Sequence, residues 1–250
     1  MKKSIETLES NYLKSYPAIQ NHEIDGWSVR LSPYLSPNYN CYIPLNTTYN
    51  CDLEKQIVTC EELFYKNGQM PVAKVLSNAP PKLSYILENR GYNFLIKYYV
   101  MALDLKKFHH HPVIVKSVHH NGAINDEIIE AYIKLNSEKA PKELKESIYS
   151  VLYNIKKTAI CSYHTKGDNI KGTAIGVICD DNINISYIES CNKENIDTER
   201  AVIDKILQKS SERKLSHACV RVKSTDRPMI DMYSELGFET VYSYLYRQKV

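Results

Sequence analysis

The chain has 250 residues, of which 24 % are charged and 43 % are hydrophobic, a composition typical of folded globular proteins and not of disordered ones. Its 32 Lys and Arg are interspersed with 29 Asp and Glu, so the net charge of +3 favours neither a nucleic-acid partner nor a membrane surface. No apolar run approaches the roughly 20 residues that a membrane-spanning helix needs.

The beginning of the chain and its cysteines bear on the cellular compartment. The first ten residues, MKKSIETLES, contain no apolar segment of the kind that a secretory signal requires. We therefore expect a cytoplasmic protein. The seven Cys residues include no C-x-x-C pair, so the sequence indicates neither a disulfide framework nor a cysteine zinc site.

The first hundred residues switch repeatedly between helical and strand patterns. Apolar residues one turn apart predict helices, and alternating apolar and polar residues predict strands. The predicted helices are 4–16, 53–67 and 84–90, and the predicted strands are 25–31, 40–45, 71–76 and 94–103. Pro17, Gly68 and Gly91 stand at the ends of these helices, where such residues are favoured.

Residues 106–122 hold five of the eight histidines, at positions 109, 110, 111, 119 and 120. Adjacent histidines on an extended segment point in different directions, and no nearby Cys or carboxylate completes a metal-binding motif. A metal site is therefore the weaker interpretation. We expect a solvated linker and no metal.

After residue 122 the patterns predict a further set of elements. The predicted helices are 126–135, 141–157 and 198–214, and the predicted strands are 159–163, 172–179 and 183–190. Polar turns such as 180–182 join the strands. The order of helices, strand meander, helix and strand is typical of an α/β protein.

The most informative stretch is 220–247, VRVKSTDRPMIDMYSELGFETVYSYLYR. It predicts a strand, a helix and a last strand without a break. Thr225 and Asp226 offer side-chain oxygens to the free N–H groups of a helix start, and Pro228 suits a first helical turn. Gly237 can take the positive φ that ends such a helix.

This stretch resembles the C-terminal end of the GNAT (GCN5-related N-acetyltransferase) superfamily. The family pattern is a strand, Asn-x-x-Ala, two residues, Leu-Tyr, three residues and Gly-Phe; the matching positions are Asp226, Met229, Met232, Tyr233, Gly237 and Phe238. In the family the Tyr before Gly-Phe protonates the departing CoA thiolate, so the resemblance implies that Tyr233 is the general acid. The alternative is a ring that simply packs on its helix face.

Two further parts of the chain resemble a two-lobed GNAT subfamily. The matching residues at the opening are Pro17, Ala18, Asp25, Gly26, Trp27, Arg30, Asn40, Pro44 and Leu45, and those at the end are Tyr244, Tyr246 and Arg247. The chain also repeats itself: Gly91-Tyr92 precedes Tyr98 by the same offset that separates Gly237-Phe238 from Tyr244. In the first copy, Leu87 stands at the position of the tyrosine.

The resemblance implies an α/β protein with a mixed twisted sheet flanked by helices, the acyl-CoA N-acyltransferase (GNAT) fold in two tandem GNAT-like lobes. We expect a degenerate N-terminal lobe at 1–105, a linker at 106–122 and an acetyltransferase lobe at 123–250. The resemblance further implies acetyl-CoA as the acyl donor and an amine of a small molecule or peptide as the acceptor. Either a monomer or a homodimer is expected.

The donor site is where the sequence departs from the family. GNAT enzymes hold the CoA diphosphate with an R-x-x-G-x-G/A loop, whose glycines let backbone N–H groups approach the phosphates. The corresponding residues 192–200, NKENIDTER, contain no glycine, and their Glu194, Asp197 and Glu199 would repel a diphosphate. The expected cofactor-binding residues are Ile188, Ser190, Asn195, Ile196, Asp197, Thr198, Arg200, Asp226 and Pro228.

Two functions remain open at this point. In an enzyme, residues 188–190 present backbone groups to the pantetheine arm, Tyr233 is the acid, and water or Glu189 takes the proton of the acceptor amine. In a binding or regulatory module, the fold persists around a decayed donor site. The glycine-free loop favours the module, and the block from Tyr233 to Phe238 favours the enzyme.

Overall fold

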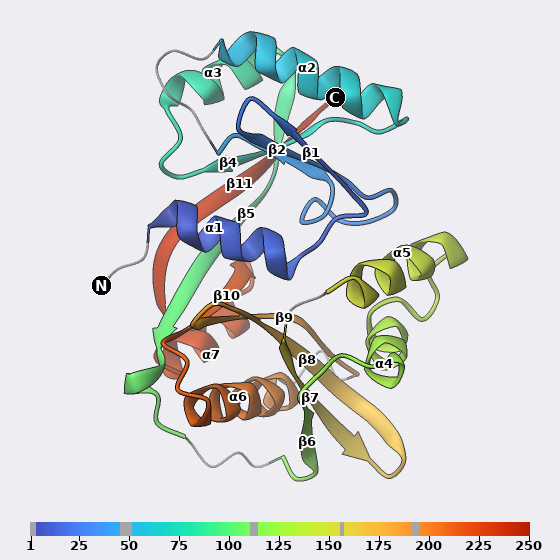
Figure 1. Cartoon of the computed structure of the whole chain (residues 1–250), viewed down its shortest axis with the longest axis vertical. Helices are drawn as coiled ribbons and strands as arrows, with labels where there is room; N and C mark the ends of the chain where they lie inside the picture. Colours follow the sequence, from blue (N-terminus) through green and yellow to red (C-terminus); the bar gives the residue numbers. More distant parts are fainter. Residues whose placement is uncertain (1–3, 46–51, 111–114, 156–157, 192–195) are drawn as a thin grey trace. The chain divides into compact units, whose positions relative to one another are not determined.

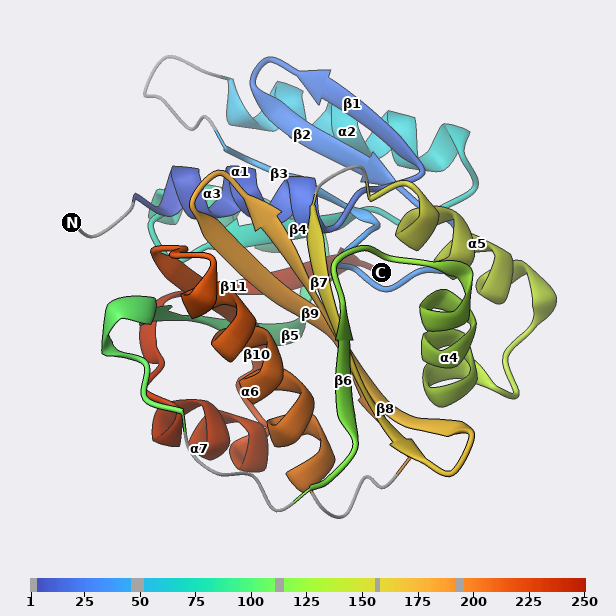
Figure 2. The same cartoon turned by 60° about the horizontal axis from the view of Figure 1, so that its bottom comes forward.

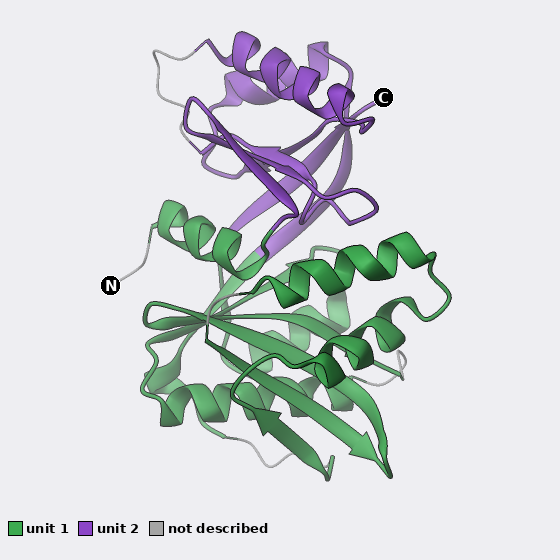
Figure 3. Ribbon diagram, turned by 45° about the vertical axis from the view of Figure 1, so that its right-hand side comes forward, with its two compact units in different colours: residues 1–17, 100–241 green, residues 18–99, 242–250 purple. Residues whose placement is uncertain are grey.

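Figures 1 and 2 show the computed structural model of the chain, which describes residues 4–45, 52–110, 115–155, 158–191 and 196–250. The chain divides into two compact units, coloured separately in Figure 3. Unit 1 contains residues 1–17 and 100–241, and unit 2 contains residues 18–99 and 242–250. No helix in the described ranges is long and apolar enough to cross a membrane.

Unit 1 is a mixed sheet flanked by helices. Its helices are α1 (Ile5–Ser15), α4 (Asp126–Ser137), α5 (Lys142–Tyr153), α6 (Asp197–Glu212) and α7 (Arg227–Glu235), with a short 3-10 helix at Leu105–Lys107. Its strands are β6 (Val118–Asn121), β7 (Ala159–Lys166), β8 (Asn169–Cys179), β9 (Asn182–Ser190), β10 (His217–Lys223) and parts of β5 (Tyr92–Asp104) and β11 (Glu239–Lys249). The strand order is β11-β5-β10-β9-β8-β7-β6, in which β6 to β9 are antiparallel and β10 runs parallel to β9.

The two faces of β8 carry different helices, because successive side chains of a strand point to opposite faces. A Cβ atom on Gly176 would lie 3.0 Å from the Ile206 side chain, so α6 covers this face at close range. Three residues further on, the Sγ of Cys179 lies 3.7 Å from the carbonyl oxygen of Asn11, which places α1 on the other face. The sheet is therefore buried on both sides.

Unit 2 is a smaller mixed sheet with its own aromatic core. Its elements are β1 (Gln20–Ile24), β2 (Trp27–Leu31), β3 (Cys41–Ile43), α2 (Leu53–Lys66), β4 (Val72–Leu76), α3 (Pro81–Asn89) and the remaining parts of β5 and β11, in the strand order β1-β2-β3-β4-β11-β5. The rings of Trp27 and Tyr42 stack at 6.0 Å, and Phe64 and Tyr92 meet Tyr42 edge-on. These four rings are almost wholly buried.

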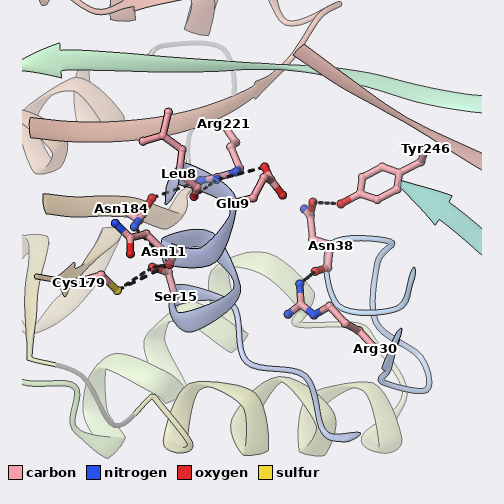
Figure 4. A network of polar contacts seen from close by, with 10 residues as sticks. All are labelled: Leu8, Glu9, Asn11, Ser15, Arg30, Asn38, Cys179, Asn184, Arg221 and Tyr246. Carbon is pink, nitrogen blue, oxygen red and sulfur yellow. Dashed lines mark hydrogen bonds and ion pairs between the residues drawn. The ribbon is translucent and has the colours of Figure 1, made fainter. Parts of the chain in front are cut away.

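Two residues of the resemblance, Arg30 and Tyr246, both bind Asn38 in unit 2. The guanidinium of Arg30, which is fully buried, donates to the carbonyl oxygen of Asn38 at 2.8 Å. The Tyr246 hydroxyl donates to the Asn38 side-chain oxygen at 3.0 Å (Figure 4). The opening and closing segments of the chain thus meet at one asparagine, although more than two hundred residues separate them.

The predicted end of the chain is confirmed in detail. Asp226 is the N-cap of α7 and accepts a hydrogen bond from the Met229 amide at 3.3 Å. Pro228 lies in the first turn, and Gly237 ends the helix with a φ of +90°. These signals act over three or four residues, so the sequence alone carries them.

The expected linker at 106–122 needs a correction. Its last part, Val118–Asn121, is strand β6 and pairs with β7 in antiparallel register. Residues 111–114, which include His111, lie outside the described residues. His110 is exposed, as expected of a solvated segment, and its Nδ1 lies 2.8 Å from the buried carboxylate of Asp204 on α6. Strand β1, Gln20–Ile24, was also absent from the predicted elements.

The compact units differ from the expected lobes at both ends of the chain. Helix α1 packs on β8 and β9, so residues 1–17 belong to unit 1 and not with the residues that follow them. The end of β11 pairs with β4, from Tyr244 opposite Leu76 to Gln248 opposite Val72, so residues 242–250 belong to unit 2. Tertiary packing and strand pairing decide this division, and neither has a local sequence signal.

The repeat seen in the sequence has a structural counterpart. Gly91 and Gly237 both take a positive φ directly after a helix, at +82° and +90°. The tyrosines that follow at equal offset, Tyr98 and Tyr244, stack on each other in unit 2 with ring centroids 5.3 Å apart. Leu87, at the position equivalent to Tyr233, is fully buried and apolar.

The thiols should react at very different rates. Cys191 is exposed, whereas burial raises the pKa of the Cys161 thiol to about 12, and that of Cys60 to about 12 as well. Because the thiolate is the reactive form, we expect iodoacetamide to label Cys191 within minutes at pH 8 and to label Cys60 and Cys161 only after unfolding. Peptide mass spectrometry would measure this, with Cys191→Ser as the control. Equal rates for Cys191 and Cys161 in the native protein would contradict the burial.

Candidate active site

The sheet of unit 1 opens between β9 and β10. The two strands pair in parallel only from His217 opposite Asn182 to Cys219 opposite Asn184, although β9 continues to Ser190 and β10 to Lys223. A register shift against β8 lies in the same part of β9, where Tyr187 has a φ of +54°. Such a bulge bends a strand away from its neighbour. The bend leaves an opening whose edge is formed by 185–190.

Tyr233 lies on α7 and is 1 % exposed. Its ring meets Phe238 edge-on with centroids 5.5 Å apart. The side chain is thus enclosed by the protein, as its exposed fraction and this ring contact show. The ring therefore packs on Phe238, as the structural alternative requires.

The surroundings of Tyr233 keep it protonated. Burial raises the pKa of the Tyr233 phenol well above its ordinary value. The phenol of Tyr16 and the carboxylates of Asp226 and Glu199 raise this pKa further. A neutral phenol that holds its proton can donate it to a developing anion.

A cluster of tyrosines connects Tyr233 with the opening in the sheet. Tyr16 follows α1, and its ring stacks on that of Tyr187 at 5.1 Å, at the bulge of β9. The ring of Tyr132, on α4, meets the ring of Tyr187 edge-on, with centroids 5.6 Å apart. The Tyr187 hydroxyl donates to the carbonyl oxygen of Ser15 at 3.3 Å. We call Tyr16, Tyr132 and Tyr187 the tyrosine cluster.

Helix α1 is fixed over the same strands by a buried polar network (Figure 4). Arg221, on β10, lies 3.7 Å from the buried carboxylate of Glu9 and donates to the carbonyl oxygen of Leu8 at 3.3 Å. Its guanidinium also lies 3.9 Å from the ring centroid of Tyr12. Asn184 accepts from the same guanidinium at 3.3 Å. The network holds the end of α1, and with it Tyr16, in place.

Glu189 lies near the end of β9 and is partly buried. Its Oε1 accepts a hydrogen bond from the Asn136 side chain at 2.5 Å. Its charge also raises the pKa of Tyr132, after burial, which is the main cause. A carboxylate held by an amide and close to the tyrosine cluster is suitably placed to take a proton from an amine.

The first turn of α6 contains several of the expected donor-site residues. Ile196 is the N-cap, Asp197 and Thr198 open the helix, and Asn195 lies outside the described residues. Arg200 pairs with Glu235 at 2.5 Å. Ser190 donates from Oγ to the Glu199 Oε1 at 2.5 Å.

Sequence reasoning missed four residues of this site. Tyr16, Tyr132 and Tyr187 are among 20 tyrosines, and no local pattern distinguishes them. Arg221 occupies an outward position in a simple alternating strand, where a charged residue is normally solvated. Arg221 is recognised as a site residue only by its contacts with Glu9 and Tyr12 of α1, and these contacts are visible only in the tertiary structure.

The comparisons with known proteins give a fold and no closer relationship. No protein-family model matches the sequence, and no curated protein matches it either. Among solved structures, a GCN5-related N-acetyltransferase from Kribbella flavida has a TM-score of 0.70 at 11 % identity, covering 98 % of this chain and 94 % of that one.

Two more solved structures point to the same architecture. A protein of unknown function from Staphylococcus epidermidis has a TM-score of 0.65 at 12 % identity and covers 96 % of both chains. A tandem GNAT protein from the clavulanic acid biosynthesis pathway has a TM-score of 0.57 at 14 % identity, covering 78 % of this chain and 68 % of that one. Identities this low show the fold alone. The chain has the GNAT fold, with a mixed sheet flanked by helices.

Proposed function

We propose that unit 1 is an N-acetyltransferase that moves an acetyl group from a thioester, with acetyl-CoA as the donor that the fold suggests, to an amine of a small molecule or peptide. The observation that carries the proposal is the buried phenol of Tyr233, which burial and the nearby Tyr16, Asp226 and Glu199 keep protonated. Its position after the Asp226 cap and before Gly237-Phe238 matches the family's acid.

The residues present fit the thioester end of such a donor. The opening between β9 and β10 offers an extended edge along 188–190, which suits the amide-containing pantetheine arm. Tyr16 of the tyrosine cluster is close enough to Tyr233 to raise the pKa of its phenol. The fit at the diphosphate end is poor, because the first turn of α6 is acidic.

In the proposed reaction each proton has a source and an end point. Glu189 takes a proton from the acceptor's ammonium group, and the free amine then attacks the carbonyl carbon. As the carbon–sulfur bond breaks, Tyr233 donates its proton to the departing sulfur. The nitrogen, now bonded to the acetyl carbon, loses its second proton through water to the Tyr233 phenolate, which restores the phenol, and Glu189 releases the first proton to solvent.

The test is release of thiol and acetylated product, followed by mass spectrometry, with acetyl-CoA and a panel of primary amines. Acetylated product that depends on the protein would support the proposal. Absence of product and of thioester binding would favour the second candidate, a binding module. The glycine-free acidic start of α6 is the observation that favours that candidate.

The pH dependence of acetyl transfer should lack a falling limb below about pH 10. A tyrosine ordinarily titrates near pH 10, and burial raises the pKa of Tyr233 further, so its acidic form persists throughout this range. The rate should rise as the acceptor amine loses its proton and then stay level. A fall between pH 8 and pH 9.5, with circular dichroism unchanged, would contradict the assigned acid. The pH limits follow tyrosine pKa values, which differ by about one unit among folded proteins.

A further inference from the structure

The start of α6 is built to disfavour a diphosphate. Helix N-termini normally attract anions, because their backbone N–H groups and dipole present positive charge. Here Asp197 and Glu199 lie in the first turn. By sequence, residues 192–200 carry three acids against two bases, so a phosphate approaching this helix would meet net negative charge.

Glu199 is the less usual of the two acids, because it is 8 % exposed. Its Oε1 accepts from Ser190, and its Oε2 has no hydrogen-bond partner among the described residues. A carboxylate oxygen in this state repels any anion brought close to it, and burial weakens the screening by solvent. The first turn of α6 thus presents an acceptor, where a phosphate would need donors.

The nearby cation does not offset this charge. Arg200, in the same turn, pairs with Glu235 of α7 at 2.5 Å. Its guanidinium is therefore engaged with a carboxylate. A diphosphate that approached Arg200 would therefore meet the charge of Glu235 beside it.

Close packing fixes the acids in place. A Cβ atom on Gly172 would lie 2.3 Å from the Thr198 side chain, so the first turn of α6 lies directly on β8. Gly172 is also the register partner of Ser190. The pair of Ser190 and Glu199 belongs to this tightly packed junction and cannot swing away from a ligand without moving the helix.

We propose that the acyl donor is recognised through its neutral pantetheine arm and thioester, and that the true donor class is a pantetheine thioester without a nucleotide diphosphate. This inference rests on the proposed function and narrows its donor. Asp197 and Glu199 are the specificity-determining residues. CoA thioesters bind through the same arm but against the charge of these two side chains.

Calorimetry with acetyl-CoA and S-acetylpantetheine tests the inference without measuring turnover. At about 20 mM salt, S-acetylpantetheine should bind at least as tightly as acetyl-CoA, and its affinity should be the same at about 300 mM salt. The affinity for acetyl-CoA should rise with salt, because screening weakens the repulsion. A phosphate held by cations would show the opposite sign.

Two substitutions isolate the acids. Glu199→Gln keeps an acceptor for Ser190, and Asp197→Asn keeps the side-chain shape. Each should tighten acetyl-CoA about fivefold at low salt, the effect of removing one repulsion of about 1 kcal/mol, and leave S-acetylpantetheine unchanged. Glu212→Gln, at the exposed far end of α6, is the matched control and should change neither affinity.

The two proposals fail in different ways. Acetyl-CoA binding more than tenfold tighter than S-acetylpantetheine, with an affinity that falls as salt rises, would overturn the donor inference and leave the acetyltransferase proposal standing. Binding of neither thioester, or binding of both without acetyl transfer to any amine, would overturn the proposed function and the donor inference with it.

Discussion

Replacing Tyr233 by Phe should lower kcat for acetyl transfer by about 100- to 1,000-fold, the usual contribution of a positioned acid. Thioester affinity should stay within about twofold, because the ring and its edge-on contact with Phe238 remain. The free energy of unfolding should change by less than about 1 kcal/mol, since the substitution removes only the hydroxyl and keeps the packed ring. A residue kept only for packing would not combine these three results.

The matched control is Tyr153→Phe, which removes a hydroxyl from a tyrosine that is 69 % exposed on α5. Its kcat, thioester affinity and unfolding free energy should all match those of the unchanged protein. Steady-state kinetics, calorimetry and urea unfolding measure the three quantities. An unchanged kcat in Tyr233→Phe would remove the acid role and leave Tyr233 as a packing residue.

Arg221→Leu should lower the free energy of unfolding of unit 1 by about 3 to 5 kcal/mol, the cost of breaking one partner out of a buried ion pair. The substitution leaves the fully buried carboxylate of Glu9 without this guanidinium and removes the donors to Leu8 and Asn184. It also releases the end of α1, so activity should fall together with stability. Urea unfolding followed by tyrosine fluorescence measures the change.

A double-mutant cycle separates this charge pairing from ordinary packing. Adding Glu9→Gln to Arg221→Leu should restore part of the lost stability, because no charge then remains buried at this position. Arg213→Leu, on an exposed arginine, is the control and should change stability by less than about 0.5 kcal/mol. Equal stability losses in the single and double variants would show that the pair does not couple α1 to β10.

Tyr233→Phe and Arg221→Leu should change different quantities, turnover in the first variant and stability in the second. In the proposed reaction Tyr233 acts on the departing sulfur, so its loss should change turnover and leave the fold intact. Arg221 acts through α1, whose end carries Tyr16 onto the bulge residue Tyr187. The loss of Arg221 should therefore lower the stability of unit 1 and, through the movement of α1, displace Tyr16 and Tyr187 at the acceptor side of the site.

The GNAT fold was predictable because its strongest signals are local. The cap at Asp226, the proline after it and the positive φ of Gly237 each depend on the few residues around them, and all three were confirmed. Helical spacing likewise located α1 and α2 to within one or two residues. Backbone conformation and capping are decided over three to four residues, which is why a single sequence carries them.

The tertiary structure decided the remaining features. Strands β1 and β6 are polar and mostly exposed, so only their pairing with β2 and β7 makes them strands. The partners of Tyr233, the burial of Arg221 and the placement of both chain ends depend on contacts between residues that can be more than two hundred positions apart. Side-chain chemistry in the sequence determined which group could act as an acid, whereas burial and packing determined that Tyr233 keeps its proton and that Glu199 is held against Ser190.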